Sequence, residues 1–216
     1  MSIKVSVVPV TPYQQNCSII QCQATGKAAV VDPGGDIDRI LSAAEQMGAT
    51  IEKIILTHGH LDHCGVSAKL RDKLEVPIEG PEAADKFWID QLPQYCKMAG
   101  FPHAEAFTPD RWLHDGDTVT VGEVELQVIH CPGHTPGHVV FVSDDNRIAW
   151  VGDVIFQGSI GRTDFPMSKH DDLIHSIRDK LFPLGDDITF VPGHGPTSTF
   201  GQERQTNPFV ADSRYG

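Results

Sequence analysis

The sequence has no apolar run long enough to cross a membrane and no stretch that resembles a signal peptide. A membrane-spanning helix needs about 20 consecutive apolar residues, and no segment approaches that length. The start, Met-Ser-Ile-Lys-Val-Ser-Val-Val-Pro, has the alternation of a short strand and lacks the apolar core of a secretory signal. We therefore expect a cytoplasmic protein that does not bind membranes.

Runs of basic residues are also missing. The chain has 17 Lys and Arg against 29 Asp and Glu, a formal net charge of −12, and its basic residues do not cluster. Binding to a polyanion requires clustered positive charge that neutralises phosphates. DNA, RNA and anionic membranes are therefore excluded as expected partners, and no motif indicates an obligate protein partner.

The chain has few cysteines, and their spacing does not indicate disulfide pairs. The odd number of scattered cysteines, without a Cys-x-x-Cys pair, argues against a disulfide framework and favours small buried side chains. They are Cys17, Cys22, Cys64, Cys96 and Cys131.

What the sequence does contain is the composition of a folded domain, with 40% hydrophobic and 21% charged residues over 216 positions. We expect a single domain over residues 1–216. Periodicity predicts strands at 5–10, 17–23, 28–32, 51–57, 76–79, 118–121, 124–130, 139–143, 147–151 and 188–191, and helices at 37–47, 63–74, 82–89 and 171–181. Two half-patterns of strands followed by helices suggest an α+β fold, a four-layer αββα sandwich.

The segment from Leu92 to Asp110 contains proline and shows no clear period, so we expect it to be irregular. It forms either a lid that brings Phe101 over a binding pocket or an ordinary surface loop, and the second interpretation is favoured.

A dense group of metal-binding residue types follows the strand expected at 51–57. Three histidines and an aspartate lie within the stretch His58-Gly59-His60-Leu61-Asp62-His63. Buried imidazoles and carboxylates this close together destabilise one another unless a cation holds them. The stretch therefore predicts a metal site.

Three later turns each place one further ligand type after an apolar strand. They are Cys131-Pro132-Gly133-His134, Val151-Gly152-Asp153 and Val191-Pro192-Gly193-His194. One such turn alone is weak support, because a single His or Asp after Gly is often only a turn residue. Together with the first cluster, they give seven ligands at strand ends, where a rigid scaffold places functional side chains.

Seven ligands suit two metal ions, because a pair that shares one carboxylate needs about six terminal ligands and leaves positions open for water and substrate. Imidazole and carboxylate ligands suit zinc, iron or manganese. We expect two divalent ions, with zinc first among the three. Such a pair lowers the pKa of a shared water, and the resulting hydroxide is the expected nucleophile, oriented by Asp62.

The motif and the three turns resemble the metallo-β-lactamase superfamily, and residues 5–195 fit its αββα layout. The resemblance implies that the first metal is held by His58, His60 and His134. It implies that the second is held by Asp62, His63 and His194. Asp153 would bridge the two ions.

Within the superfamily, the stretches Thr57–His63, Cys131–His138 and Gly152–Phe156 resemble the glyoxalase II group, short single-domain form. The resemblance implies hydrolysis of S-D-lactoylglutathione to lactate and glutathione. Longer members carry a C-terminal helical domain that contacts glutathione, whereas only some twenty residues follow His194 here. Arg162 stands near the position of a lysine of those members and either binds a substrate carboxylate or pairs with Asp164 or a backbone carbonyl. Phe156 either lines the substrate pocket or packs against the protein, and packing is favoured.

Alternatives remain open. The Gly161–Phe165 stretch also resembles the iron-dependent persulfide dioxygenases, which would use His58, His134 and Asp153 as a metal triad. Hydrolysis of lactones or other thioesters and a non-catalytic metal-binding role are further possibilities. Among the remaining histidines, His138 is the best candidate for a hydrogen bond that supports the site.

Overall fold

The computed structural model describes residues 1–215, and its first half is built on a five-stranded sheet. The strand order is β1-β2-β3-β4-β5. The first three strands pair antiparallel, and the last three pair parallel. The bounds are β1 Ile3–Val10, β2 Gln15–Cys22, β3 Lys27–Val31, β4 Thr50–Ile55 and β5 Ile78–Glu79.

The second half contributes a six-stranded sheet with the order β13-β12-β9-β8-β7-β6. Its strands pair antiparallel except β9 and β12, which run parallel. A short hairpin, β10 (Ile155–Phe156) with β11 (Ser159–Ile160), projects from it. The bounds are β6 Thr118–Val121, β7 Val124–His130, β8 Val139–Ser143, β9 Ile148–Gly152, β12 Thr189–Pro192 and β13 Ser198–Thr199.

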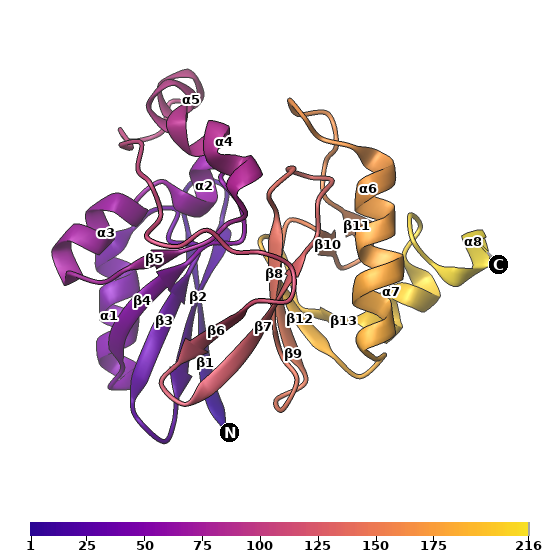
Figure 1. Cartoon of the computed structure of the whole chain (residues 1–216), viewed down its shortest axis with the longest axis horizontal. Coiled ribbons are helices and arrows are strands. Elements are labelled where there is room, and N and C mark those ends of the chain that lie inside the picture. The colour runs from indigo at the N-terminus through magenta and orange to yellow at the C-terminus, as the bar shows by residue number, and fades with distance from the viewer. Residues whose placement is uncertain (216) are drawn as a thin grey trace.

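The two sheets face each other, and helices cover their outer surfaces (Figure 1). Helices α1 (Ile37–Met47) and α3 (Ser67–Leu74) pack on the first sheet, while α6 (His170–His175) and α7 (Phe200–Thr206) lie against the second. Between the sheets, apolar side chains of both, such as Ile20 and Phe141, form one fully buried cluster. The expected four-layer αββα arrangement is confirmed.

Some helices differ from the sequence prediction. The stretch from Leu92 to Asp110 was expected to be irregular, but it begins with helix α5 (Leu92–Ala99), whose Pro93 lies in the first turn, where its missing N–H is harmless. The helix predicted at 171–181 changes at Ser176 to a π-helical turn. Helices α7 and α8 (Asp212–Tyr215) were not predicted, because the C-terminal segment is short and rich in Gly and Pro.

The helix predicted at 63–74 is divided into α2 (Leu61–Cys64) and α3. A side chain at the junction residue Gly65 would come within 2.5 Å of the carbonyl oxygen of Leu61 and 2.8 Å of that of Gly34. Gly65 keeps helical dihedrals and makes room for the Gly34 loop, whereas the break lies at Val66, whose backbone N–H donates to the carbonyl of Pro33 at 3.2 Å and not to the preceding turn of helix.

The described part of the chain also shows the state of the cysteines and the character of the helices. All five cysteines are free and buried, which agrees with the prediction of no disulfide framework. Within residues 1–215, no helix combines the length and apolar character required to cross a membrane.

Candidate metal centre

The seven predicted ligands gather at one edge of the two sheets. His58, His60, Asp62 and His63 lie on the loop and short helix α2 after β4, and the other three follow β7, β9 and β12. All are buried except His194, whose side chain is 29% exposed. Ligands from strand ends of both sheets thus meet in one place, as the sequence pattern predicted.

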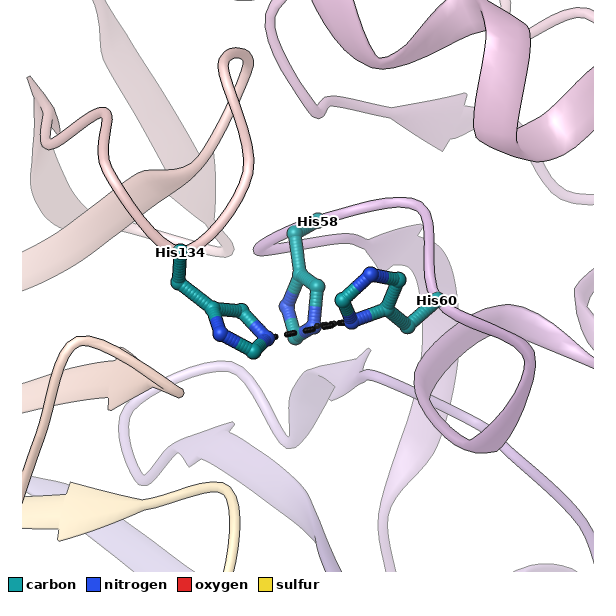
Figure 2. A group of neighbouring side chains, drawn as sticks. All are labelled: His58, His60 and His134. Carbon is teal, nitrogen blue, oxygen red and sulfur yellow. Dashed lines mark hydrogen bonds between the residues drawn. The ribbon is translucent and has the colours of Figure 1, made fainter. Parts of the chain in front are cut away.

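Three ring nitrogens form the first group (Figure 2). Nδ1 of His60 lies 3.1 Å from Nε2 of His58 and 3.0 Å from Nε2 of His134. A tetrahedral metal with nitrogen ligands at 2.0–2.1 Å would separate them by about 3.3 Å. One N–H cannot satisfy all three nitrogens, so a cation explains this convergence better than hydrogen bonding alone does.

Carboxylates join imidazoles in the second group. Nε2 of His194 lies 3.1 Å from an oxygen of Asp62, and Nε2 of His63 lies 3.3 Å from Oδ1 of Asp153. The other oxygen of Asp153 is 3.6 Å from Nε2 of His134 and 3.7 Å from Nε2 of His194. Asp153 therefore reaches both groups, which is the position that a bridging ligand needs.

The donor atoms fit a pair of divalent cations. Nε2 of His63 and Oδ1 of Asp153 are buried without a hydrogen-bond partner, which is costly unless another ligand satisfies them. The sets His58, His60, His134 and Asp62, His63, His194 each place one donor atom per residue within 4.8 Å of one another. These are the two sets that the sequence resemblance implied.

A third combination, Asp32 with His58 and His63, also lies within 4.8 Å. However, both oxygens of Asp32 already accept hydrogen bonds from Thr57, at 2.7 Å from its backbone N–H and 2.6 Å from its hydroxyl. Nδ1 of His63 lies 2.9 Å from Asp32 as well. Asp32 therefore orients the His63 ring so that Nε2 faces Asp153, the kind of support that metal-binding histidines commonly have.

Electrostatics differ between the two groups. Burial lowers the pKa of His58, His60 and His134, and the neighbouring imidazoles lower it further for His58. Burial also lowers the pKa of His63, but the charges of Asp153 and Asp62 raise it well above its ordinary value. The first group thus offers neutral rings, whereas the second must lose a proton before it can bind a cation.

Acidification should therefore release the second metal first. The pKa of His194 is raised too, since the hydrogen bond with Asp62 and the charge of Asp153 outweigh burial. As the pH falls from about 7.5 to about 5.5, protons compete for His63 and His194 before they reach the depressed histidines. We expect bound metal, measured by elemental analysis after gel filtration, to fall from two ions to about one per chain.

His138, singled out in the sequence, supports the site as expected. It is fully buried, and its Nε2 accepts a hydrogen bond of 3.1 Å from the backbone N–H of Asp153. The ring also stacks on that of His58, with centroids 4.6 Å apart. His138 therefore connects a ligand of the first group to the residue that bridges both groups.

The contacts between Asp153 and His63 also explain the glycine at position 193. The parallel pairing of β9 with β12 places the Pro192 turn beside Gly152. A Cβ at Gly193 would lie 2.1 Å from Oδ1 of Asp153 and 2.6 Å from the His63 ring. The glycine of this turn is therefore required for His63 and Asp153 to approach.

Asp85, which the sequence analysis did not single out, ties two ligand loops together. It lies in the 3₁₀ turn Ala83–Asp85 before helix α4 (Lys86–Asp90) and is fully buried. Its carboxylate accepts hydrogen bonds from the backbone N–H of Gly59 at 2.9 Å, the Thr135 hydroxyl at 2.8 Å and the backbone N–H of Gly137 at 2.6 Å. It thereby fixes the His58–His60 segment relative to the loop that carries His134.

Replacing Asp85 with asparagine should weaken metal binding without unfolding the chain. The amide keeps the shape of the carboxylate but has only one acceptor oxygen for the three donors. We expect metal affinity, measured by competition with a chelator, to fall about tenfold or more. Thr135→Val removes one donor and should have a smaller effect; unchanged affinity in Asp85→Asn would contradict a tie between the loops.

The two predicted substrate contacts lie differently. Arg162 lines a cavity of about 310 Å³ that also includes His60 and Asp62, and its guanidinium pairs with Asp164 at 2.9 and 3.0 Å. Phe156 does not line that cavity, although its ring centroid is 6.3 Å from that of His194. The structure thus brings Arg162 beside the candidate ligands and leaves Phe156 at the periphery.

Comparison with known proteins agrees with this architecture. The family model described as the metallo-beta-lactamase superfamily matches residues 10–201. The chain is 43% identical over 209 residues to the hydroxyacylglutathione hydrolase GloC of Haemophilus influenzae, covering 96% of this chain and 98% of that protein. It is 30% identical to the probable metallo-hydrolase YqgX of Bacillus subtilis, covering 94% and 95%.

Solved structures give the same result. The B3 metallo-beta-lactamase BLEG-1 superposes with a TM-score of 0.88 at 32% identity, covering 96% of this chain and 99% of that one. TTHA1623 in a di-iron-bound form gives 0.86 at 31% identity, covering 95% and 100%. ETHE1 from Myxococcus xanthus gives 0.79 at 24% identity, covering 98% and 85%, a likeness that concerns the fold alone. The chain belongs to the metallo-beta-lactamase superfamily.

Proposed function

We propose that the protein is a metal-dependent thioester hydrolase that converts S-(2-hydroxyacyl)glutathione, such as S-D-lactoylglutathione, to the 2-hydroxy acid and glutathione. The observation that carries the proposal is the meeting of two ligand groups at Asp153 beside an accessible cavity. Similarity to the GloC hydrolase over nearly the whole chain supports this substrate class.

The residues divide the work between two metals, which we propose to be zinc, with iron or manganese as alternatives. His58, His60 and His134 would hold one ion, and Asp62, His63 and His194 the other, with Asp153 between them. Two such cations, when bound, would supply an acidified water and polarise the scissile carbonyl. Asp62 borders the cavity and contacts His194, so its carboxylate is placed to orient the attacking water. A thiolate leaving group requires no general acid.

Arg162 is placed to receive a carboxylate of the glutathione moiety. Both partners of its pair with Asp164 are well exposed, at 68% and 65%. Exposed ion pairs contribute little stability, so a substrate carboxylate can replace Asp164 at small cost. Arginine suits this exchange because its planar fork binds carboxylates with two hydrogen bonds.

Loss of the thioester absorbance of S-D-lactoylglutathione tests the proposal, with protein of assayed metal content. We expect rapid hydrolysis that is lost in a His58→Ala variant of the same fold. Metal-loaded protein without hydrolysis would overturn the assignment. Oxygen uptake with glutathione persulfide would then indicate the dioxygenase alternative that the Gly161–Phe165 stretch suggests; the presence of His63 and His194 in a second group favours hydrolysis.

A further inference from the structure

The cavity beside the candidate metal centre has two walls of different chemistry. Helices α4 and α5 contribute residues to one wall, and the loop between β11 and α6 contributes residues to the other. Figure 1 shows these segments at the same end of the molecule, the helices beside the first sheet and the loop beside the second. Trp88, Leu92 and Tyr95 come from the helical wall; Arg162, Phe165 and Pro166 come from the loop. The ring of His60 contacts both walls, with centroids 4.4 Å from Trp88 and 4.8 Å from Phe165, and Asp62 lines the cavity as well.

The helical wall is apolar. Trp88 and Leu92 are 4% and 1% exposed, and the Trp88 ring contacts those of Tyr95 and His60, with centroids 5.0 and 4.4 Å apart. Among the described residues that line this cavity, Arg162 is the single cation, and Asp164 pairs with it. The interior thus suits an uncharged group, whereas the charged ends of glutathione suit the exposed rim at Arg162.

The size of the cavity indicates what the uncharged group is. Beyond the scissile carbonyl, a lactoyl group adds one carbon, a methyl and a hydroxyl, about the space of three waters at about 30 Å³ each. The cavity holds about 310 Å³, which leaves room for a larger apolar acyl group beside the sulfur end of the thiol portion.

We propose that the preferred thioester carries a bulky apolar or aromatic substituent on its hydroxyl-bearing carbon, an inference that rests on the proposed function. That substituent packs against Trp88, Leu92 and Tyr95, while the thiol portion extends past Arg162. Trp88, on this assignment, determines the choice of acyl group. Filling an apolar pocket discriminates by about tenfold or more per added group, so the preference should be measurable.

The test compares S-D-mandeloylglutathione with S-D-lactoylglutathione, which differ only by phenyl in place of methyl. We expect kcat/KM at least about tenfold higher for the mandeloyl compound, mainly through a lower KM. Because the two thioesters also differ in intrinsic reactivity, the decisive quantity is the change of this ratio in a variant. In Trp88→Ala and Tyr95→Ala, the ratio should fall about tenfold.

Met98→Ala is the matched control, because Met98 lies on α5, is 73% exposed and does not line the cavity; its ratio should stay that of the unaltered protein. Arg162→Gln should raise KM for both thioesters alike. If lactoylglutathione is hydrolysed but the ratio is the same in Trp88→Ala and Tyr95→Ala, the acyl pocket is wrong and the proposed function stands. Hydrolysis of neither thioester overturns both.

Discussion

Replacing Asp153 with alanine is expected to reduce kcat for S-D-lactoylglutathione by at least about 10³-fold. Its carboxylate is the group that contacts both ligand sets, at 3.3 Å from His63 and 3.6 Å from His134. With two cations bound as proposed, the substitution would remove their shared ligand and their fixed spacing. The measurement is steady-state kinetics with metal content assayed for each preparation.

Two further variants make the result specific to the bridge. Asp153→Asn keeps the shape and should still fail, because a neutral amide cannot balance two cations. Asp171→Ala removes an exposed carboxylate from α6 and should keep full activity. If Asp153→Ala binds two ions with unchanged affinity and retains more than about a tenth of the activity, Asp153 is not a bridging ligand.

Removal of the metals should lower thermal stability strongly. Without cations the centre leaves buried nitrogens and carboxylate oxygens without partners, as at His63 Nε2 and Asp153 Oδ1. A ligand at about 1,000 times its Kd adds about 4 kcal/mol to the free energy of unfolding. For a chain of this size that corresponds to roughly 8 to 16 °C in Tm per site. Calorimetry before and after chelation measures the difference.

Adding the metal back tests whether loss of the cations causes the fall in Tm. Adding zinc back to the chelated protein should restore the original Tm, and the same additions to Asp153→Ala should raise Tm by a smaller amount. A Tm that stays constant while elemental analysis shows the metals leaving would mean that the cluster is stable without cations, which contradicts the role proposed for it.

Local patterns predicted the strands well where side chains alternate between core and solvent. Strands β6, β7 and β8 have the predicted bounds, because each has turn residues at its ends. The clustered ligands were equally visible, since their spacing within one loop places them together in any fold. Prediction failed at α5, where Pro93 was interpreted as disrupting regular structure although it occupies the first turn of a helix.

The residues that support the site could not be found in the same way. Asp32 was expected only as the last residue of the strand at 28–32, although it orients His63. Asp85 gives no local signal, because its three donors come from loops 26 to 52 positions away in the sequence. A role that depends on tertiary contacts becomes visible only when the loops are brought together.

The division of the ligands between the sheets has a consequence for how the chain matures during synthesis. The first four ligands emerge from the ribosome early, but His194 takes its place only after β12 has paired with the earlier strand β9. Because synthesis proceeds from the N-terminus at about 5–20 residues per second, a nascent chain completes the set His58, His60 and His134 well before the set that includes His194. We therefore expect the two cations to bind in sequence, the second only after the turn that follows β12 has folded against β9.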